Sequence, residues 1–303
     1  QFINYIGVFV MKMNFKLKIL TVAALMAASV PAFAAIEGGA TGNGELLLNV
    51  RYYGGDSATS GDDDISGLFD LGFKMNDMLA ANGQDGFSKT WNLTGGAYGA
   101  SWNQLMSFVG PANAGQIEFS VIALDNTDPN TTGGSRYLTT GNKDAWPSQG
   151  NTNVKGFANM EQYIDANNSR GTHATDANGA SVAKPTDATN TFFGAINGFG
   201  QGDTWLQKTT VDTTQVLGTD QNFWFLTTSS TASLAQATKT PFGVDLNHDG
   251  SINGNEFGKF KLTESGVLSY TNPVSAVPEA DTWAMLMAGL GLLGMMVRRR
   301  TGV

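Results

Sequence analysis

Apolar and polar residues alternate over several short stretches of this chain, a pattern typical of half-buried β-strands. Residues 46–53 are the clearest example, because every second side chain is apolar and a Gly-Gly pair follows the stretch. The last two stretches are separated by Glu264, Ser265 and Gly266, which predicts a β-hairpin. The same pattern predicts further strands at residues 66–73, 87–93, 116–125, 221–228, 257–263 and 267–271.

Helical periodicity is weaker and confined to short segments. Ser101 to Gln104 has the spacing of a capping box, and apolar residues then follow on one helical face until Gly110. We therefore predict a helix that begins at this box and ends before Gly110. Further short helices or helical turns are predicted near residues 75–79, 157–164 and 205–206.

Two long segments, residues 126–156 and 169–190, are rich in Asn, Thr, Gly and Asp and are predicted to be surface loops. Many short strands, turn signals between them and few helices favour an all-β architecture. The expected fold class is therefore mainly β: a β-sandwich-like body with a few short helices and long loops. A single hydrophobic helix is expected at the C-terminus, outside this body.

The N-terminal segment has the three parts of a secretory signal peptide. Basic residues at positions 12, 16 and 18 precede an apolar run at residues 19–30, which is too short to span a membrane. Ala32 and Ala34 then fit a cleavage site that would leave Ala35 as the new N-terminus. The residues before the first methionine read as an upstream extension of the reading frame. We assign residues 1–34 to this extension and the signal peptide, and expect export.

The other end of the chain, residues 277–303, has the pattern of a short membrane anchor. An uncharged apolar run covers residues 283–297 and would form a helix about 22 Å long, shorter than a hydrocarbon core of about 30 Å. A basic cluster follows, and such clusters prefer the cytoplasmic side of a membrane. The body is therefore expected on the far side, to which the signal peptide would also send it. The cluster consists of Arg298, Arg299 and Arg300.

The tail also opens with a Pro-Glu motif, Val277-Pro278-Glu279. This motif, the apolar run and the arginines, behind a signal peptide, resemble the PEP-CTERM sorting signal of exopolysaccharide-producing Gram-negative bacteria. The resemblance implies that a membrane-embedded exosortase recognises the motif, cuts near it and releases the body to the cell surface or extracellular matrix. Ala280 stands where the family motif has a second proline, which relaxes a rigid extended segment.

Composition narrows the function of the body, residues 35–276. The whole chain carries a formal charge of -8, but six of its bases lie in the two terminal segments. Setting these aside, with the two acids of the tail, leaves 12 basic and 24 acidic residues. Nucleic-acid binding is therefore not expected, because it depends on Lys and Arg neutralising phosphates. The chain has no cysteine, which excludes disulfides and thiolate metal sites.

One segment of the body, residues 245–256, carries a motif with specific chemistry. It matches the twelve-position calcium loop D-x-N-x-D-G-x-I-x-x-x-E, whose oxygen ligands suit a hard cation. Ile252 is expected to point back into the fold. The flanking residues read as β segments, so an isolated EF-hand-like or dockerin-like loop is predicted in place of a paired helical sensor. The predicted calcium ligands are Asp245, Asn247, Asp249, Ser251, Asn253 and Glu256.

No nucleotide-binding loop, zinc-protease motif or supported catalytic triad occurs in the sequence. We therefore expect a non-catalytic, calcium-stabilised surface or matrix protein that is first held at the inner membrane and that contacts exopolysaccharide. One alternative is a carbohydrate-binding or adhesive module, with Tyr52, Trp146 or Trp205 as stacking platforms. A second is a secreted polysaccharide hydrolase, which needs only two suitably placed carboxylates.

Overall fold

The computed structural model describes residues 35–54, 63–127, 134–141, 150–194, 213–232, 234–275 and 280–300. The predicted signal peptide and the Val277-Pro278-Glu279 motif lie outside these residues. The strands are β1 (Glu45–Tyr52), β2 (Ile65–Lys74), β3 (Ser88–Asn92), β4 (Glu118–Asp125), β5 (Arg136–Gly141), β6 (Ala180–Ala183), β7 (Gln215–Val216), β8 (Asp220–Thr227), β9 (Thr238–Pro241), β10 (Lys259–Leu262) and β11 (Val267–Thr271). The α-helices are α2 (Met75–Ala81), α3 (Gly99–Val109), α4 (Asn151–Lys155), α5 (Met160–Asn167) and α7 (Ala280–Arg300).

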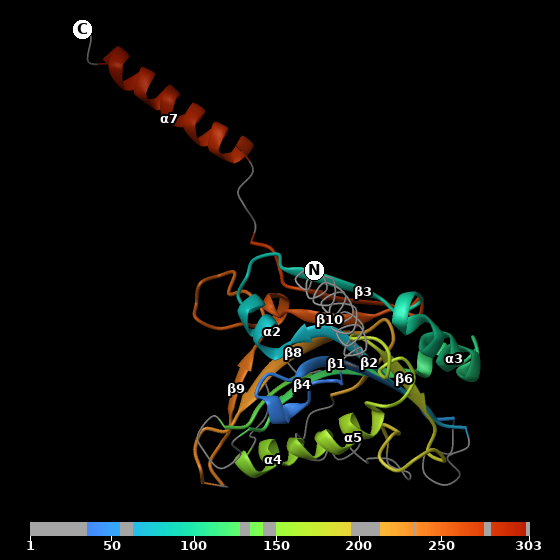
Figure 1. Cartoon of the computed structure of the whole chain (residues 1–303). Helices are drawn as coiled ribbons and strands as arrows, with labels where there is room; N and C mark the ends of the chain where they lie inside the picture. The colour runs from blue at the N-terminus through green and yellow to red at the C-terminus, as the bar shows by residue number, and fades with distance from the viewer. Residues whose placement is uncertain are drawn as a thin grey trace, which may run out of the picture.

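All of these strands belong to one 11-stranded antiparallel sheet. Its order is β3-β11-β10-β8-β5-β4-β1-β2-β6, while β7 pairs with β4 and β9 pairs with β8. The sheet curls, and helices α4 and α5 lie along one of its faces (Figure 1). The mainly β class is thus confirmed, whereas the two packed sheets of a β-sandwich are not, because one hydrogen-bonded ladder links these strands.

The curled sheet buries side chains on both faces, and β1 shows why. Leu46 and Leu48 belong to a core cluster inside the curl, which also includes side chains of α2 and α3. Leu47 points to the opposite face and joins a second cluster with Phe157 and Ile164 from the α4–α5 region. Successive side chains of a strand point to opposite faces, so the sequence Leu-Leu-Leu serves both clusters at once.

The predicted strands are confirmed, and so is the hairpin between β10 and β11. At its turn, Gly266 has a φ of 77°, a left-handed conformation that glycine adopts without strain. Its backbone N–H donates to the carbonyl of Thr263 at 3.0 Å. This hairpin continues the sheet between β8 and the edge strand β3.

The predicted helices are confirmed in position, but the proposed capping box is wrong. Helix α3 begins at Gly99, two residues before Ser101, and its N-cap residue Tyr98 makes no side-chain cap. A 3-10 turn at Gly96–Tyr98 leads directly into the helix, so the chain is already helical where the box was expected. The helix ends at Gly110 as predicted, where the glycine N–H donates to Met106. The turn predicted at residues 205–206 lies outside the described residues.

Both predicted surface loops contain regular structure, which corrects that expectation. Strand β5 lies inside the first segment and pairs on one side with β4 and on the other with β8, so it is a central strand. Strand β6 lies inside the second segment and pairs with β2 at an end of the sheet. Tertiary pairing stabilises these strands, although Thr139 and Thr140 in β5 give little hydrophobic signal.

The C-terminal helix α7 stands clear of the sheet (Figure 1). Its described side chains, residues 284–299, are all exposed, including Arg298 and Arg299. No helix in the described part of the chain has both the length and the apolar character required to cross a membrane. The helix itself is thus present, while a transmembrane role for it is not shown.

Candidate functional site

The acidic loop, residues 245–256, connects β9 to β10, so its flanks are β segments as predicted. Its two ends are held together at the base. The N–H of Val244 donates to the carbonyl of Glu256 at 2.9 Å, and Gly243 pairs with Phe257 in an isolated β-bridge. A 3-10 turn at Gly254–Glu256 closes the loop. Ile252 packs against the second core cluster, which confirms its predicted inward direction.

Within the loop, side-chain oxygens bind backbone N–H groups. Asp245 Oδ2 accepts from the N–H of Gly250 at 2.9 Å, and Asn247 Oδ1 accepts from Asp249 at 2.9 Å. Asp249 Oδ1 accepts from the N–H of Ser251 at 2.8 Å. Gly250 has a φ of 85°, which explains why glycine occupies the sharp turn. The polar side chains therefore stabilise the shape of this exposed loop by accepting hydrogen bonds from its backbone.

Glu256 closes the acidic loop from its far end. The residue is only 3% exposed, although the acid group is strongly polar. Its Oε1 accepts from the N–H groups of Leu246 and Asn247, at 3.1 and 3.2 Å, and its Oε2 accepts from Asn253 at 2.9 Å. Asn253 completes a capping box with Glu256. Glu256 therefore has a structural role that the motif alone did not reveal.

The donor chemistry of the acidic loop suits a hard cation, because every predicted ligand offers oxygen. The carboxylates are not gathered, however. Within the described ranges, no group of three or more His, Asp or Glu side chains is arranged to hold a metal ion. Asp245, Asp249 and Glu256 instead bind backbone amides of the loop. The loop thus has the residues for calcium without a preassembled carboxylate cluster.

A second group of acids, missed in the sequence, lies where β1 meets β2. Asp70 in β2 is 1% exposed and shares a side-chain hydrogen bond with Glu45 at the start of β1. Asp70 Oδ1 also accepts from the N–H of Gly72 at 2.9 Å. Nearby, Lys74 forms an ion pair with Glu37 at 2.6 Å on the surface. The only signal in the sequence is one acid inside an otherwise apolar strand.

Burial controls the protonation of this Glu45–Asp70 carboxyl pair. Loss of solvation, reinforced by the charge of Glu45, raises the pKa of Asp70 to about 8. Burial also raises the pKa of Glu45. The pair therefore retains one proton at neutral pH and behaves as a unit. Asp70 is inaccessible to solvent, so its carboxyl group cannot contact a polysaccharide chain in this conformation.

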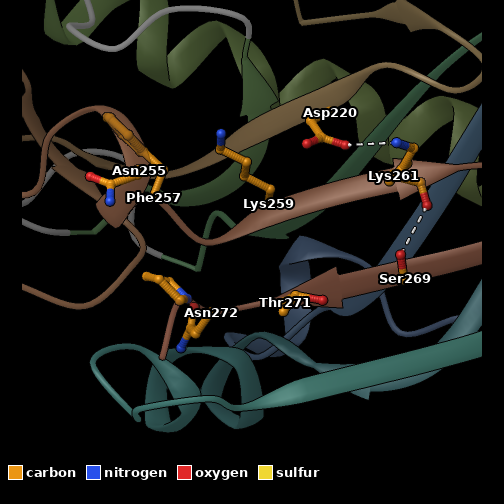
Figure 2. A pocket seen from close by; sticks show the side chains of 9 residues that line it. Asp220, Asn255, Phe257, Lys259, Lys261, Ser269, Thr271 and Asn272 are labelled. Atoms are coloured by element: carbon orange, nitrogen blue, oxygen red, sulfur yellow. Dashed lines mark hydrogen bonds and ion pairs between the residues drawn. The ribbon is translucent and has the colours of Figure 1, made fainter. Parts of the chain in front are cut away.

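A surface groove of about 300 Å³ lies on β10 and β11 (Figure 2). Lys259 and Lys261 come from β10, and Ser269 and Thr271 from β11. Asp220, at the start of β8, forms an ion pair with Lys261 at 3.4 Å. The sequence showed the alternation of these lysines with core residues, but no local pattern showed that they line a groove. Its remaining lining residues are Asn255, Phe257, Asn272 and Pro273.

Two other residues considered from the sequence occupy positions that differ from expectation. Tyr52 is 7% exposed and belongs to the inner core cluster, so it cannot serve as a stacking platform. His173 lies in the segment 169–190 that was predicted to be a surface loop, but it is 1% exposed, and burial lowers its pKa to about 4. Trp146 and Trp205 lie outside the described residues. None of the three aromatics considered for sugar stacking is therefore placed on a described surface.

Comparison with known proteins identifies one segment. The PEP-CTERM protein-sorting motif matches residues 276–300, which include helix α7. No curated protein matches the chain, and no solved structure matches it. The match supports a secreted protein that an exosortase-type enzyme sorts and processes. The body carries no such assignment.

Proposed function

We propose that this chain is an exported, non-catalytic protein of the cell surface or exopolysaccharide matrix, delivered by exosortase processing of its tail. The match to the sorting motif at residues 276–300 carries the proposal. The signal-peptide pattern of residues 1–34 supports it independently, because it directs the body to the same side of the membrane. Helix α7 would hold the chain at the inner membrane until the tail is cut, with Arg298–Arg300 on the cytoplasmic side.

The mature C-terminus tests this proposal. In the native host, the extracellular protein should end near Val277-Pro278-Glu279, as measured by mass spectrometry. Glu279→Ala should keep the tail and remain in the membrane fraction, because the recognition motif is altered. Glu264→Ala, which removes an exposed acid of the body outside the matched residues 276–300, should be processed normally. Full-length protein with an intact tail in the extracellular fraction would contradict the proposal.

We further propose that the acidic loop binds calcium and that the ion stabilises the body. The supporting observations are the match of the loop to the calcium-loop pattern and the hydrogen bonds by which its carboxylate and amide oxygens hold the backbone in a closed turn. Asp245, Asn247, Asp249 and Glu256 would supply side-chain oxygens, with the Ser251 carbonyl and Asn253 beside them. A ligand that binds only the folded state at 100 times its Kd stabilises that state by about 2.7 kcal/mol.

Asp249→Asn is the most informative variant for calcium. It keeps the oxygen that accepts from Ser251 but removes one negative charge. The unaltered protein should melt at a higher temperature with calcium than with a chelator, and the variant should lose most of that difference. Asp176→Asn, at an exposed position outside the loop, should keep it. Identical melting of the unaltered protein in calcium and chelator refutes calcium binding.

A non-catalytic body is also a proposal, with a direct test. Asp70, one member of the Glu45–Asp70 pair, is buried and closed to substrate. On this proposal, incubation of the purified protein with the host exopolysaccharide should release no new reducing ends. Release of reducing ends would favour the secreted polysaccharide hydrolase instead.

A further inference from the structure

The β10–β11 groove includes four side chains on the outer face of the hairpin, Lys259, Lys261, Ser269 and Thr271, that do not belong to either core cluster. Strand β10 alternates between buried Phe260 and Leu262, in the inner core, and Lys259 and Lys261, on the opposite face. Strand β11 alternates in the same way. The register places Lys259 opposite Thr271 and Lys261 opposite Ser269. The hairpin thus presents two lysine–hydroxyl pairs side by side on its outer face (Figure 2).

The charges of the groove are only partly compensated. Lys261 is paired with Asp220 at 3.4 Å, whereas Lys259 makes no ion pair within the described part of the chain. The body as a whole carries twice as many acids as bases. The repulsion from distant acids is screened beyond about 8 Å at physiological ionic strength, so the groove's own charges dominate at contact. Lys259 is therefore available to an anionic group of a ligand.

The neutral groups around Lys259 add hydrogen-bonding capacity. Thr271 and Asn255 are exposed, and Ser269 is partly exposed. Their hydroxyl and amide groups can donate to and accept from sugar hydroxyls. Asp220 can also accept from a hydroxyl, while it disfavours ligands with closely spaced negative charges. This combination suits a saccharide with many hydroxyls and with carboxylates that are separated from one another by a sugar unit.

We propose that the groove binds a carboxylate-bearing saccharide, a short stretch of an acidic polysaccharide. The inference rests on the proposed matrix function and assigns a site and a ligand class to it. Lys259 pairs with a sugar carboxylate as a compact charge, and Thr271 and Asn255 bind neighbouring hydroxyls. Residues i and i+2 of a strand are about 6.6 Å apart along its axis. Lys259 and Lys261 therefore contact successive parts of an extended saccharide chain.

Calorimetric titration tests this site with defined probes. The full chain, purified in detergent micelles from a host without an exosortase, is titrated with tetragalacturonate and, separately, with neutral maltotetraose. Tetragalacturonate should bind with an affinity that falls as salt increases, and maltotetraose should bind much more weakly. Lys259→Gln should weaken tetragalacturonate binding about tenfold, the effect of losing one charge-assisted contact. Lys259→Arg should retain most of the affinity.

Lys155→Gln is the matched control, since it removes a lysine from helix α4, away from the groove. It should bind tetragalacturonate as the unaltered protein does. Four results would each overturn the proposal. The first two are equal binding of maltotetraose and unchanged tetragalacturonate binding by Lys259→Gln. The other two are full competition by inorganic sulfate at the same concentration and no binding of tetragalacturonate at all. The titration does not depend on sorting. A failed titration together with a correctly processed tail therefore refutes only the saccharide-binding proposal. Normal saccharide binding together with an unprocessed tail refutes only the sorting proposal.

Discussion

Replacing Asp70 with asparagine should remove a distinctive pH dependence of stability. In the folded protein, burial raises the pKa of Asp70 to about 8, whereas an unfolded Asp has a pKa of about 3.9. Between these values the folded state holds a proton that the unfolded state has lost. The contribution of this pair to the free energy of unfolding is therefore greatest at low pH, and it decreases as the pH rises towards 8. The introduced amide would mimic the protonated acid, because it keeps an oxygen for Gly72 and offers N–H groups to Glu45.

The magnitude follows from the number of protons exchanged. One proton difference changes the free energy of unfolding by about 1.4 kcal/mol for each pH unit. From pH 6.5 to 7.5 the unaltered protein should therefore lose about 1.4 kcal/mol through this pair, or about 3–6 °C in Tm for a domain of this size. Unfolded His173 has a pKa of about 6.5 and folded His173 a pKa of about 4, so this residue adds a smaller slope of opposite sign at the lower end of the interval. Comparison with the Asp70→Asn variant, which keeps His173, isolates the contribution of the carboxyl pair.

Urea unfolding at pH 6.5 and 7.5 measures this difference directly. The Asp70→Asn variant should show a smaller decrease and should exceed the unaltered protein in stability at pH 7.5. Asp176→Asn makes the same substitution at an exposed site and should keep the original pH dependence. Parallel pH profiles for the unaltered protein and the Asp70→Asn variant would show that the carboxyl pair holds no extra proton, and would refute the reasoning.

Three further predictions concern stability. Phe260→Ala should lower the free energy of unfolding by about 3–5 kcal/mol, because the ring is fully buried among other aromatic rings; a loss below about 1 kcal/mol in urea unfolding would contradict this packing. His173→Gln should reduce the acid sensitivity between about pH 4 and 6.5, where only the unfolded histidine gains a proton, and unchanged acid melts would refute it. Gly266→Ala should lower the Tm, because its Cβ would lie 2.7 Å from Trp102 Nε1; an unaltered Tm would count against the turn geometry.

Several features followed from local sequence because their cause is local. Alternating side chains predicted β1 and the β10–β11 hairpin, since a strand with one face in a core must repeat every two residues. The sorting tail was equally readable, because an apolar run beside three arginines keeps its character in any fold. The acidic loop is also a local motif, and its folded backbone required only short-range hydrogen bonds.

Tertiary structure decided the features that depend on distant partners. Strand β5 has a weak pattern of its own and is held between β4 and β8, which lie on either side of it in the sheet. Asp70 and Glu45 are far apart in sequence, and only the β1–β2 pairing brings them into a buried site where one proton is retained. The groove likewise needed β8, β10 and β11 together. Sequence reveals periodicity and motifs, whereas burial and charge pairing arise only when separate segments meet in space.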